Sequence, residues 1–418
     1  MSASRVVVLG SGFAGLETAF LLRSRVGADK AEIILVSDRD EFLFKPAGVY
    51  LPFGGAEWPM HSPLAKGLRR RDIEQRVATV QGVDTARGVV ETTGGPVGYD
   101  RLVIATGASM RPDEIPGLAE YGRQVWTPAQ LHQLGEDLQW VVQNARHGRP
   151  QRVVFVVPPN NKCAGPLYEL VFMLDTWLRR REVRHQVDIE FTTTEHTFIQ
   201  AFGPKLHEVV RREFEIRDIS GHTGVDAAKV TENEITYSDG SAREFDVLVA
   251  FPPYAAAIDY DGLPRDDRGF LTCDPGTRTV DGFPEIFAPG DAGDFPVKQA
   301  FLALQQADAA AGTLAMELGS AVEPTEFEPV SMCVMEMFDK ATFAQVPLTL
   351  TGEPASPIAV DIDDPAYRVG TNPLWRLGKK ALGLYVPTWF RMGLPVHSGP
   401  AWRAMELGLG VGSRVLAK

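Results

Sequence analysis

Cys163 is the residue whose type and setting point most directly to chemistry. It directly follows Lys162 and stands at the start of a helix that the apolar pattern predicts over residues 166–181. A helix N-terminus and a neighbouring ammonium group both favour the thiolate, which is the nucleophilic form of cysteine. We therefore expect Cys163 to be a redox-active thiol. Glu169, six residues further on, is expected either to carry protons for it or to cap an exposed first turn.

The overall composition limits the class of protein to which such a thiol could belong. A chain of 418 residues suits two domains and an appendage, and its three cysteines are too few for a disulfide framework. The net charge of -12 argues against a nucleic-acid partner. No run of 18 apolar residues could span a bilayer, and we predict no metal site. Since Met1 leads directly into a predicted strand at residues 6–9, we expect no signal peptide and a cytoplasmic location.

A glycine-rich segment at the N-terminus predicts a dinucleotide site. Gly10, Gly12 and Gly15 follow a β-branched strand (5–9) and open a helix (16–24), and Asp38 comes after the next strand (31–36). In this strand–turn–helix context, Gly10 makes the tight turn and Gly12 lets the pyrophosphate approach the backbone. Gly15 permits close packing of helix against strand, and Asp38 is placed to accept hydrogen bonds from a ribose.

A second strand–helix–strand unit has lost the corresponding glycines. Strands are predicted over 152–157, 187–192 and 245–251, but the loop after the first contains Pro158 and Pro159. Proline has no N–H to offer a phosphate, so we do not expect NAD(P)H to bind there in the usual way. The prediction is an α/β fold with two Rossmann-like domains, the second degenerate, and a C-terminal membrane-associating region. The first dinucleotide-binding domain comprises 1–118 and 256–320, the second domain 119–255, and the C-terminal region 321–418.

The last fifty residues differ from the rest in charge. From residue 368 onward there are eight Lys or Arg and one acid, and three of the seven tryptophans. A helix predicted over 374–386 places Arg376, Lys379 and Lys380 on one side and apolar residues on the other. We interpret it as an amphipathic segment lying on the inner face of the cell membrane, with the basic residues attracted to anionic lipid. The alternatives are packing on the protein's own acidic surface or at the interface of a homo-oligomer.

Several motifs resemble known families. Thr106 with Gly107, and the segment ending in Gly290 and Asp291, resemble the other FAD motifs of the pyridine nucleotide-disulfide reductase-like superfamily. That resemblance implies FAD, with Asp291 on its ribitol chain and the helix after Lys298 directed at the flavin ring. Residues 163–169, 36–38 and 42–46, which include Lys45, resemble segments of the sulfide:quinone oxidoreductases. This implies Cys333, in a predicted hairpin (330–346), as the second redox cysteine. It further implies oxidation of sulfide or a related small thiol to persulfide or polysulfide, with a membrane quinone as electron acceptor.

The same residues leave other functions open. The third functional cysteine of many members of that family has no counterpart in residues 124–128, and we interpret Cys273, in a strand-like segment (269–274), as structural. The main alternative is an enzyme like the type II NADH:quinone oxidoreductases, against which the lost glycine loop argues. A flavocytochrome sulfide dehydrogenase subunit would need export. A flavin-binding redox sensor without turnover is the alternative outside the enzymes.

Overall fold

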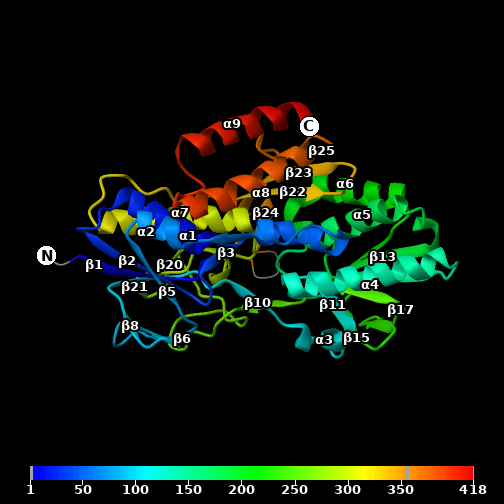
Figure 1. The fold of residues 1–418 in the computed structure, drawn as a ribbon, viewed down its shortest axis with the longest axis horizontal. Helices are drawn as coiled ribbons and strands as arrows, with labels where there is room; N and C mark the ends of the chain where they lie inside the picture. Colours follow the sequence, from blue (N-terminus) through cyan, green and yellow to red (C-terminus); the bar gives the residue numbers. More distant parts are fainter. Residues whose placement is uncertain (1–2, 354–356, 418) are drawn as a thin grey trace.

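Two parallel β-sheets form the frame of the molecule, as the computed structural model shows for residues 3–353 and 357–417 (Figure 1). Lys418, counted in the basic tail, lies outside the described residues. The first sheet has the order β20-β21-β9-β1-β2-β5, in which only the β20–β21 pair is antiparallel. Its strands are β1 (Ser4–Leu9), β2 (Ala31–Ser37), β5 (Ile73–Val77), β9 (Arg101–Ile104), β20 (Thr279–Val280) and β21 (Phe283–Phe287).

The two faces of the first sheet are covered differently. Val6 and Val8 of β1 pack in a core with helices α1 (Phe13–Arg25) and α7 (Ala300–Glu317). Val7 and Leu9 point to the other face, as alternation along a strand requires. That face is covered by a small antiparallel sheet and by the segment around Cys273. The small sheet consists of β6 (Val80–Asp84), β7 (Val89–Thr92) and β8 (Val97–Gly98).

The second sheet is parallel throughout, with the order β11-β18-β12-β13-β14. Its strands are β11 (Gly122–Gln124), β12 (Gln151–Val157), β13 (Val187–Thr193), β14 (Ser220–Thr223) and β18 (Val247–Ala250). Three helices belong to this unit, α4 (Pro128–Arg146), α5 (Gly165–Arg179) and α6 (Gly203–Arg217). One face of the sheet is covered by β15 (Ala227–Val230), β16 (Glu234–Tyr237) and β17 (Ala242–Glu244).

The chain leaves and re-enters the first unit through paired segments. β10 (Ala108–Met110) on the way out pairs antiparallel with β19 (Tyr254–Ala256) on the way back. Beside the first sheet lie β3 (Glu41–Leu43), β4 (His61–Pro63) and α2 (Ala65–Arg70). The 3-10 segment Lys45–Phe53 packs against α4 and α5, and α3 (Leu118–Tyr121) packs beside β11 and β15 of the second unit. The predicted α/β fold with two dinucleotide-type units is confirmed, and we keep the domain limits given above as a proposal.

The C-terminal region adds an antiparallel sheet and two helices. The sheet consists of β22 (Val330–Glu336), β23 (Ala341–Leu350), β24 (Ile358–Val360) and β25 (Arg368–Asn372). α8 (Trp375–Met392) packs against β22, and α9 (Gly399–Leu416) lies outside α8 along one edge of the molecule (Figure 1). None of the helices in the described residues is long and apolar enough to cross a membrane.

One predicted element is absent. The segment 269–274 forms no strand, because Leu271 and Cys273 make only isolated bridges to neighbouring segments. Most other boundaries move by one to three residues, while α8 extends six residues past the predicted end.

Candidate active site

The N-terminus of α1 is open to an anion. Gly12 is the N-cap, no side chain caps the helix, and the first turn contains no acidic residue. A Cβ at Gly12 would meet no atom within 4 Å, so a ligand can approach the free N–H groups of the first turn. At Gly15, by contrast, a Cβ would lie 1.9 Å from the carbonyl oxygen of Gly10. The backbone is thus open at Gly12 and closely packed at Gly15.

The predicted cofactor residues of the other motifs lie close to this helix end. Gly290, at φ +79°, is so near α1 that a Cβ would come within 2.8 Å of the Cβ of Ala14. Thr106 accepts a hydrogen bond from the Tyr260 hydroxyl at 3.1 Å, and Gly107 next to it has φ +77°. Asp38 follows β2, and its side chain is more than half exposed beside Arg39. The structure therefore brings the three sequence motifs together around one site.

Asp291 presents a carboxylate without a protein donor. Among the described residues, none donates a hydrogen bond to it, and burial raises its pKa against the opposing charges of Lys298 and Lys45. Lys298 is buried, and burial lowers its pKa to about 8 although Asp291 acts in the other direction. Lys45 lies over the ring of Trp126, 3.4 Å from its centroid. A ligand that supplied hydroxyl donors to Asp291 and negative charge to the lysines would satisfy all three groups. The ribitol and pyrophosphate of FAD have this chemistry.

The two predicted redox cysteines approach one another from separate parts of the chain. Cys163 comes from the loop before α5 and Cys333 from β22, and both are half-buried against the same core. They lie close enough for Cys333 to act electrostatically on the pKa of Cys163, as does Asp291 of the cofactor site. Tyr254 is also within electrostatic reach of Cys163. The cysteine pair and the cofactor motifs therefore belong to one site.

The surroundings of Cys163 differ from the expectation that its setting favours the thiolate. Burial, the neighbouring Cys333 and Asp291 all raise the pKa of Cys163, and the N–H of Gly165 at the helix start offsets only part of this. Burial likewise raises the pKa of Cys333 to about 12, against the opposing charge of Lys379. Lys162 does not rank among the groups that act on Cys163, because desolvation and nearby negative groups dominate. This environment favours the protonated thiol at both cysteines.

Glu169 is a buried member of an ionic cluster, so it does not cap an exposed turn. It accepts a hydrogen bond from the N–H of Glu336 at 2.7 Å and pairs with Lys379. Glu336, fully buried, accepts from Arg376 at 2.7 Å and from the Tyr50 hydroxyl at 3.0 Å. Burial raises the pKa of Glu169 in spite of Lys379. Since Glu169 also acts on the pKa of Cys333, it is placed where a proton carrier for the pair would be needed.

The same contacts correct the predicted orientation of α8. Arg376 and Lys379 point inward to buried carboxylates and are not available to lipid headgroups. The exposed side of the helix carries its apolar residues, with Leu384 71% exposed, together with Lys380. α9 likewise exposes Leu407, Val411 and Val415. Two of the tail's tryptophans are also internal, since Trp375 stacks on Phe343 and Trp402 packs on His397.

Sequence reasoning missed Glu336 and Tyr50 and assigned Cys273 in agreement with the structure. Cys273 lies in the core of the first unit, where its thiol donates to the carbonyl of Leu271 at 3.2 Å. The signal for Glu336 was a single acid at the end of an otherwise apolar strand. For Tyr50, the preceding sequence offered no signal.

Comparisons with known proteins agree with this fold. Residues 4–156 match the family model described as pyridine nucleotide-disulphide oxidoreductase. A sulfide-quinone reductase of Aquifex aeolicus is 30% identical over 255 residues, which are 60% of this chain and 57% of that protein. A NADH dehydrogenase-like protein of Mycobacterium tuberculosis is 27% identical over 298 residues, 69% of this chain and 72% of the relative. The crystal structure of the sulfide:quinone oxidoreductase from Aquifex aeolicus superposes with a TM-score of 0.84 at 22% identity, covering 99% of this chain and 96% of that one.

Residues 4–156 and the overall fold together define a chain with the pyridine nucleotide-disulphide oxidoreductase fold. Within that class, the chain resembles the sulfide:quinone oxidoreductases, as its sequence motifs predicted. The sequence alignment with the Aquifex relative nevertheless spans little more than half of that protein's length.

Proposed function

We propose that this protein oxidises sulfide through a Cys163–Cys333 pair and passes the electrons through FAD to a membrane quinone. The observation that carries the proposal is the proximity of these two thiols to each other and to Asp291 of the cofactor motif. Cys163 comes from the second dinucleotide-type unit and Cys333 from the C-terminal hairpin, and both Cys333 and Asp291 act electrostatically on the pKa of Cys163. The two cysteines are far apart in the sequence, and packing alone would not require a cysteine at both positions.

The chemistry begins from a disulfide between the two cysteines. Hydrosulfide attacks one sulfur, so that a new sulfur–sulfur bond forms, the disulfide breaks, and the other cysteine leaves as a thiolate. The persulfide sulfur then transfers to a second sulfide or an acceptor thiol. The remaining pair gives up two electrons when it closes again to the disulfide. FAD, when bound, accepts these electrons and supplies them to the quinone.

The protonated thiols of the reduced pair fit this sequence. The attacking nucleophile in the first step is hydrosulfide, so the step does not need a cysteine of low pKa. The leaving sulfur does need a proton afterwards, because burial disfavours its thiolate. We assign the delivery of that proton to Glu169, because it acts electrostatically on Cys333 and because burial raises its own pKa, which favours its protonated form.

The loop before α5 supports sulfide over NADH as the electron donor. Pro158 and Pro159 contribute no N–H groups, and Asn161 uses its side-chain amide to bond the carbonyl of Phe251 at 2.8 Å. The carbonyl of Lys162 accepts from the N–H of Lys298. The loop is therefore tied to the protein itself, and its two prolines remove N–H groups that a pyrophosphate could use.

The outward apolar faces of α8 and α9 support attachment to a membrane surface. Seven large apolar side chains on and next to these helices are exposed, namely Leu374, Leu377, Leu384, Met392, Leu407, Val411 and Val415. Soluble surfaces seldom gather such residues on adjacent helices unless they meet a partner or a bilayer. A lipid quinone could then reach the site from the membrane, past the Glu169 and Glu336 cluster on the inner side of α8.

A second candidate is an NADH:quinone oxidoreductase. The similarity to the mycobacterial NADH dehydrogenase-like protein, over 72% of its length, is the observation in its favour. It leaves the two cysteines without a role.

Trapping of the sulfur adduct tests the proposal. The oxidised, FAD-loaded protein is mixed anaerobically with one equivalent of sulfide, quenched by alkylation and analysed by peptide mass spectrometry. We expect one added sulfur on the peptide of Cys163 or Cys333. Cys273→Ser is the matched control and should behave as the natural protein, because that thiol is a buried donor to Leu271. Absence of an adduct on both cysteines in a protein that carries their disulfide would contradict the proposal.

A further inference from the structure

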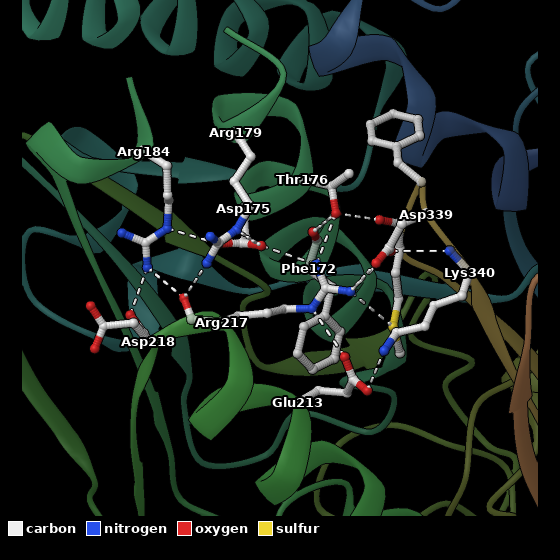
Figure 2. A network of polar contacts seen from close by, with 12 residues as sticks. Phe172, Asp175, Thr176, Arg179, Arg184, Glu213, Arg217, Asp218, Asp339 and Lys340 are labelled. Atoms are coloured by element: carbon white, nitrogen blue, oxygen red, sulfur yellow. Dashed lines mark hydrogen bonds and ion pairs between the residues drawn. The ribbon is translucent and has the colours of Figure 1, made fainter. Parts of the chain in front are cut away.

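The tip of the β22–β23 hairpin is fastened to the end of α5 by a buried network of charges (Figure 2). Its centre is Arg217, the last residue of α6, whose side chain is only 5% exposed. One guanidinium nitrogen donates to Asp175 at 3.0 Å and to the hydroxyl of Thr176 at 2.8 Å. A second contacts both carboxylate oxygens of Asp339 at 2.9 Å, and Nε donates to Glu213 at 3.1 Å. A single side chain therefore joins two helices and the hairpin tip.

Supporting contacts balance the charge of this network. Lys340, next to Asp339 in the tip, pairs with Glu213 at 2.7 Å. Arg184 contacts the fully buried Asp175 at 2.8 Å and donates to the carbonyl of Arg217 at 2.9 Å. Cations at that carbonyl also offset the negative end of α6. Because every buried acid has a cation, removal of Arg217 leaves buried carboxylates with fewer partners.

The network lies on the same two elements that carry the redox pair. α5 starts two residues after Cys163 and ends at Arg179, while β22 carries Cys333 and leads into the tip. Nearer the thiols, the N–H of Glu336 in β22 donates to Glu169 of α5 at 2.7 Å. At the network itself, Thr176 donates to the carbonyl of Met337 at 2.6 Å. Arg180 donates to the carbonyl of Phe338 at 2.8 Å. The strand is thus held along the helix from the tip toward the thiols.

A small slip of the hairpin would separate the thiols. A shift of one residue along a strand moves a side chain by about 3.3 Å and turns it to the opposite face. A disulfide tolerates only a narrow range of Cβ separations, of roughly 3.5–4.5 Å. Buried charge pairs are costly to assemble, and the setting of register is their best-attested use.

We propose that Arg217 is a positioning residue for the cysteine pair. By binding Asp175 of α5 and Asp339 of the tip on one guanidinium, it sets the register of β22 against α5 and so favours closure of the Cys163–Cys333 disulfide. The inference rests on the proposed function, since it assumes that the pair cycles between dithiol and disulfide.

The test measures the disulfide equilibrium of the FAD-loaded protein in anaerobic glutathione buffers. Two protein thiols are oxidised to the disulfide while one oxidised glutathione is reduced to two glutathione thiols. The disulfide fraction is determined by alkylation and peptide mass spectrometry, with urea unfolding of each variant measured alongside. Arg217→Met removes the guanidinium that joins α5 to the hairpin tip. Asp339→Asn weakens only the contact between Arg217 and the partly exposed tip. Arg211→Gln, which breaks surface pairs one to two turns earlier in α6, is the matched control.

We expect Arg217→Met to lower the equilibrium constant for disulfide formation roughly tenfold, or about 30 mV for a two-electron couple. Asp339→Asn should lower it severalfold and Arg211→Gln should leave it unchanged. Should Arg217→Met fail to fold, Asp339→Asn decides alone. Variants that unfold earlier yet keep the natural constant within twofold would show a merely structural network and overturn the inference. If the natural protein forms no disulfide in any buffer, the proposed function fails and the inference with it.

Discussion

Replacement of Lys379 by methionine should destabilise the protein through Glu169. Lys379 is the cation that faces this carboxylate, and both side chains are largely buried. Methionine keeps most of the aliphatic length but leaves Glu169 with the N–H of Glu336 as its remaining donor. Removal of one partner of a buried pair costs about 3–5 kcal/mol, and the retained N–H bond places this site at the lower end, near 3 kcal/mol.

The loss should depend on pH. Burial already raises the pKa of Glu169 above that of an unfolded glutamate, and removal of Lys379 raises it further. An acid with a raised folded-state pKa stabilises the fold at low pH, and this contribution is lost as pH rises through that pKa. Because the pKa of Glu169 is higher in the variant, its stabilising contribution continues to fall up to a higher pH than in the natural protein. The destabilisation should therefore be largest near pH 8 and shrink by roughly 1–2 kcal/mol near pH 6.

Urea unfolding of the FAD-loaded protein at both pH values measures this effect. Lys380→Met is the matched control, because the neighbouring lysine is exposed and should change stability by no more than about 0.5 kcal/mol. A double variant with Glu169→Gln should recover much of the loss. Equal effects of the Lys379 and Lys380 variants at both pH values would refute the inward orientation of the basic side of α8.

Three further predictions concern other parts of the molecule. Gly15→Ala should abolish or strongly reduce FAD content in purified protein, because the added Cβ would collide with the Gly10 carbonyl; full FAD content would contradict this. Leu384→Glu should weaken binding to phosphatidylethanolamine/phosphatidylglycerol vesicles at least tenfold in flotation assays without lowering the unfolding midpoint, and unchanged flotation would argue against membrane contact by α8. Glu17→Gln should reduce the loss of stability that accompanies a rise in pH. Burial and Asp308 raise the pKa of Glu17, so the natural protein loses stability as pH rises above the range of an unfolded glutamate. Parallel pH profiles for the two proteins would refute that assignment.

Local signals in the sequence were sufficient for the elements and the cofactor motifs. The strand before Gly10 and the helix after Gly12 follow from β-branched and apolar patterns within a few residues. The start of α5 after Cys163 was marked by Pro166 at the first turn, where proline is favoured. The segment 269–274 had an apolar pattern but no neighbouring strand to pair with continuously, and so remained irregular.

The charged side chains could not be placed from the sequence in the same way. The amphipathic character of α8 was predicted, but the direction of its basic side depends on Glu169 and Glu336, which are distant in the chain. The acidity of Cys163 was misjudged for a related reason. The helix start and Lys162 are adjacent in sequence, whereas the burial, Cys333 and Asp291 that outweigh them arise from tertiary structure. Arg217 lies in an ordinary amphipathic helix, and only the fold connects it to the hairpin tip.

The most direct test of the central claim is the anaerobic visible spectrum of the purified protein with sulfide and with NADH in separate experiments. The proposed function predicts rapid loss of the oxidised flavin band with sulfide alone. It also predicts that Cys163→Ser and Cys333→Ser abolish this loss while Cys273→Ser preserves it. Loss of the band with NADH alone, and none with sulfide, would contradict the proposal and support the NADH:quinone oxidoreductase instead.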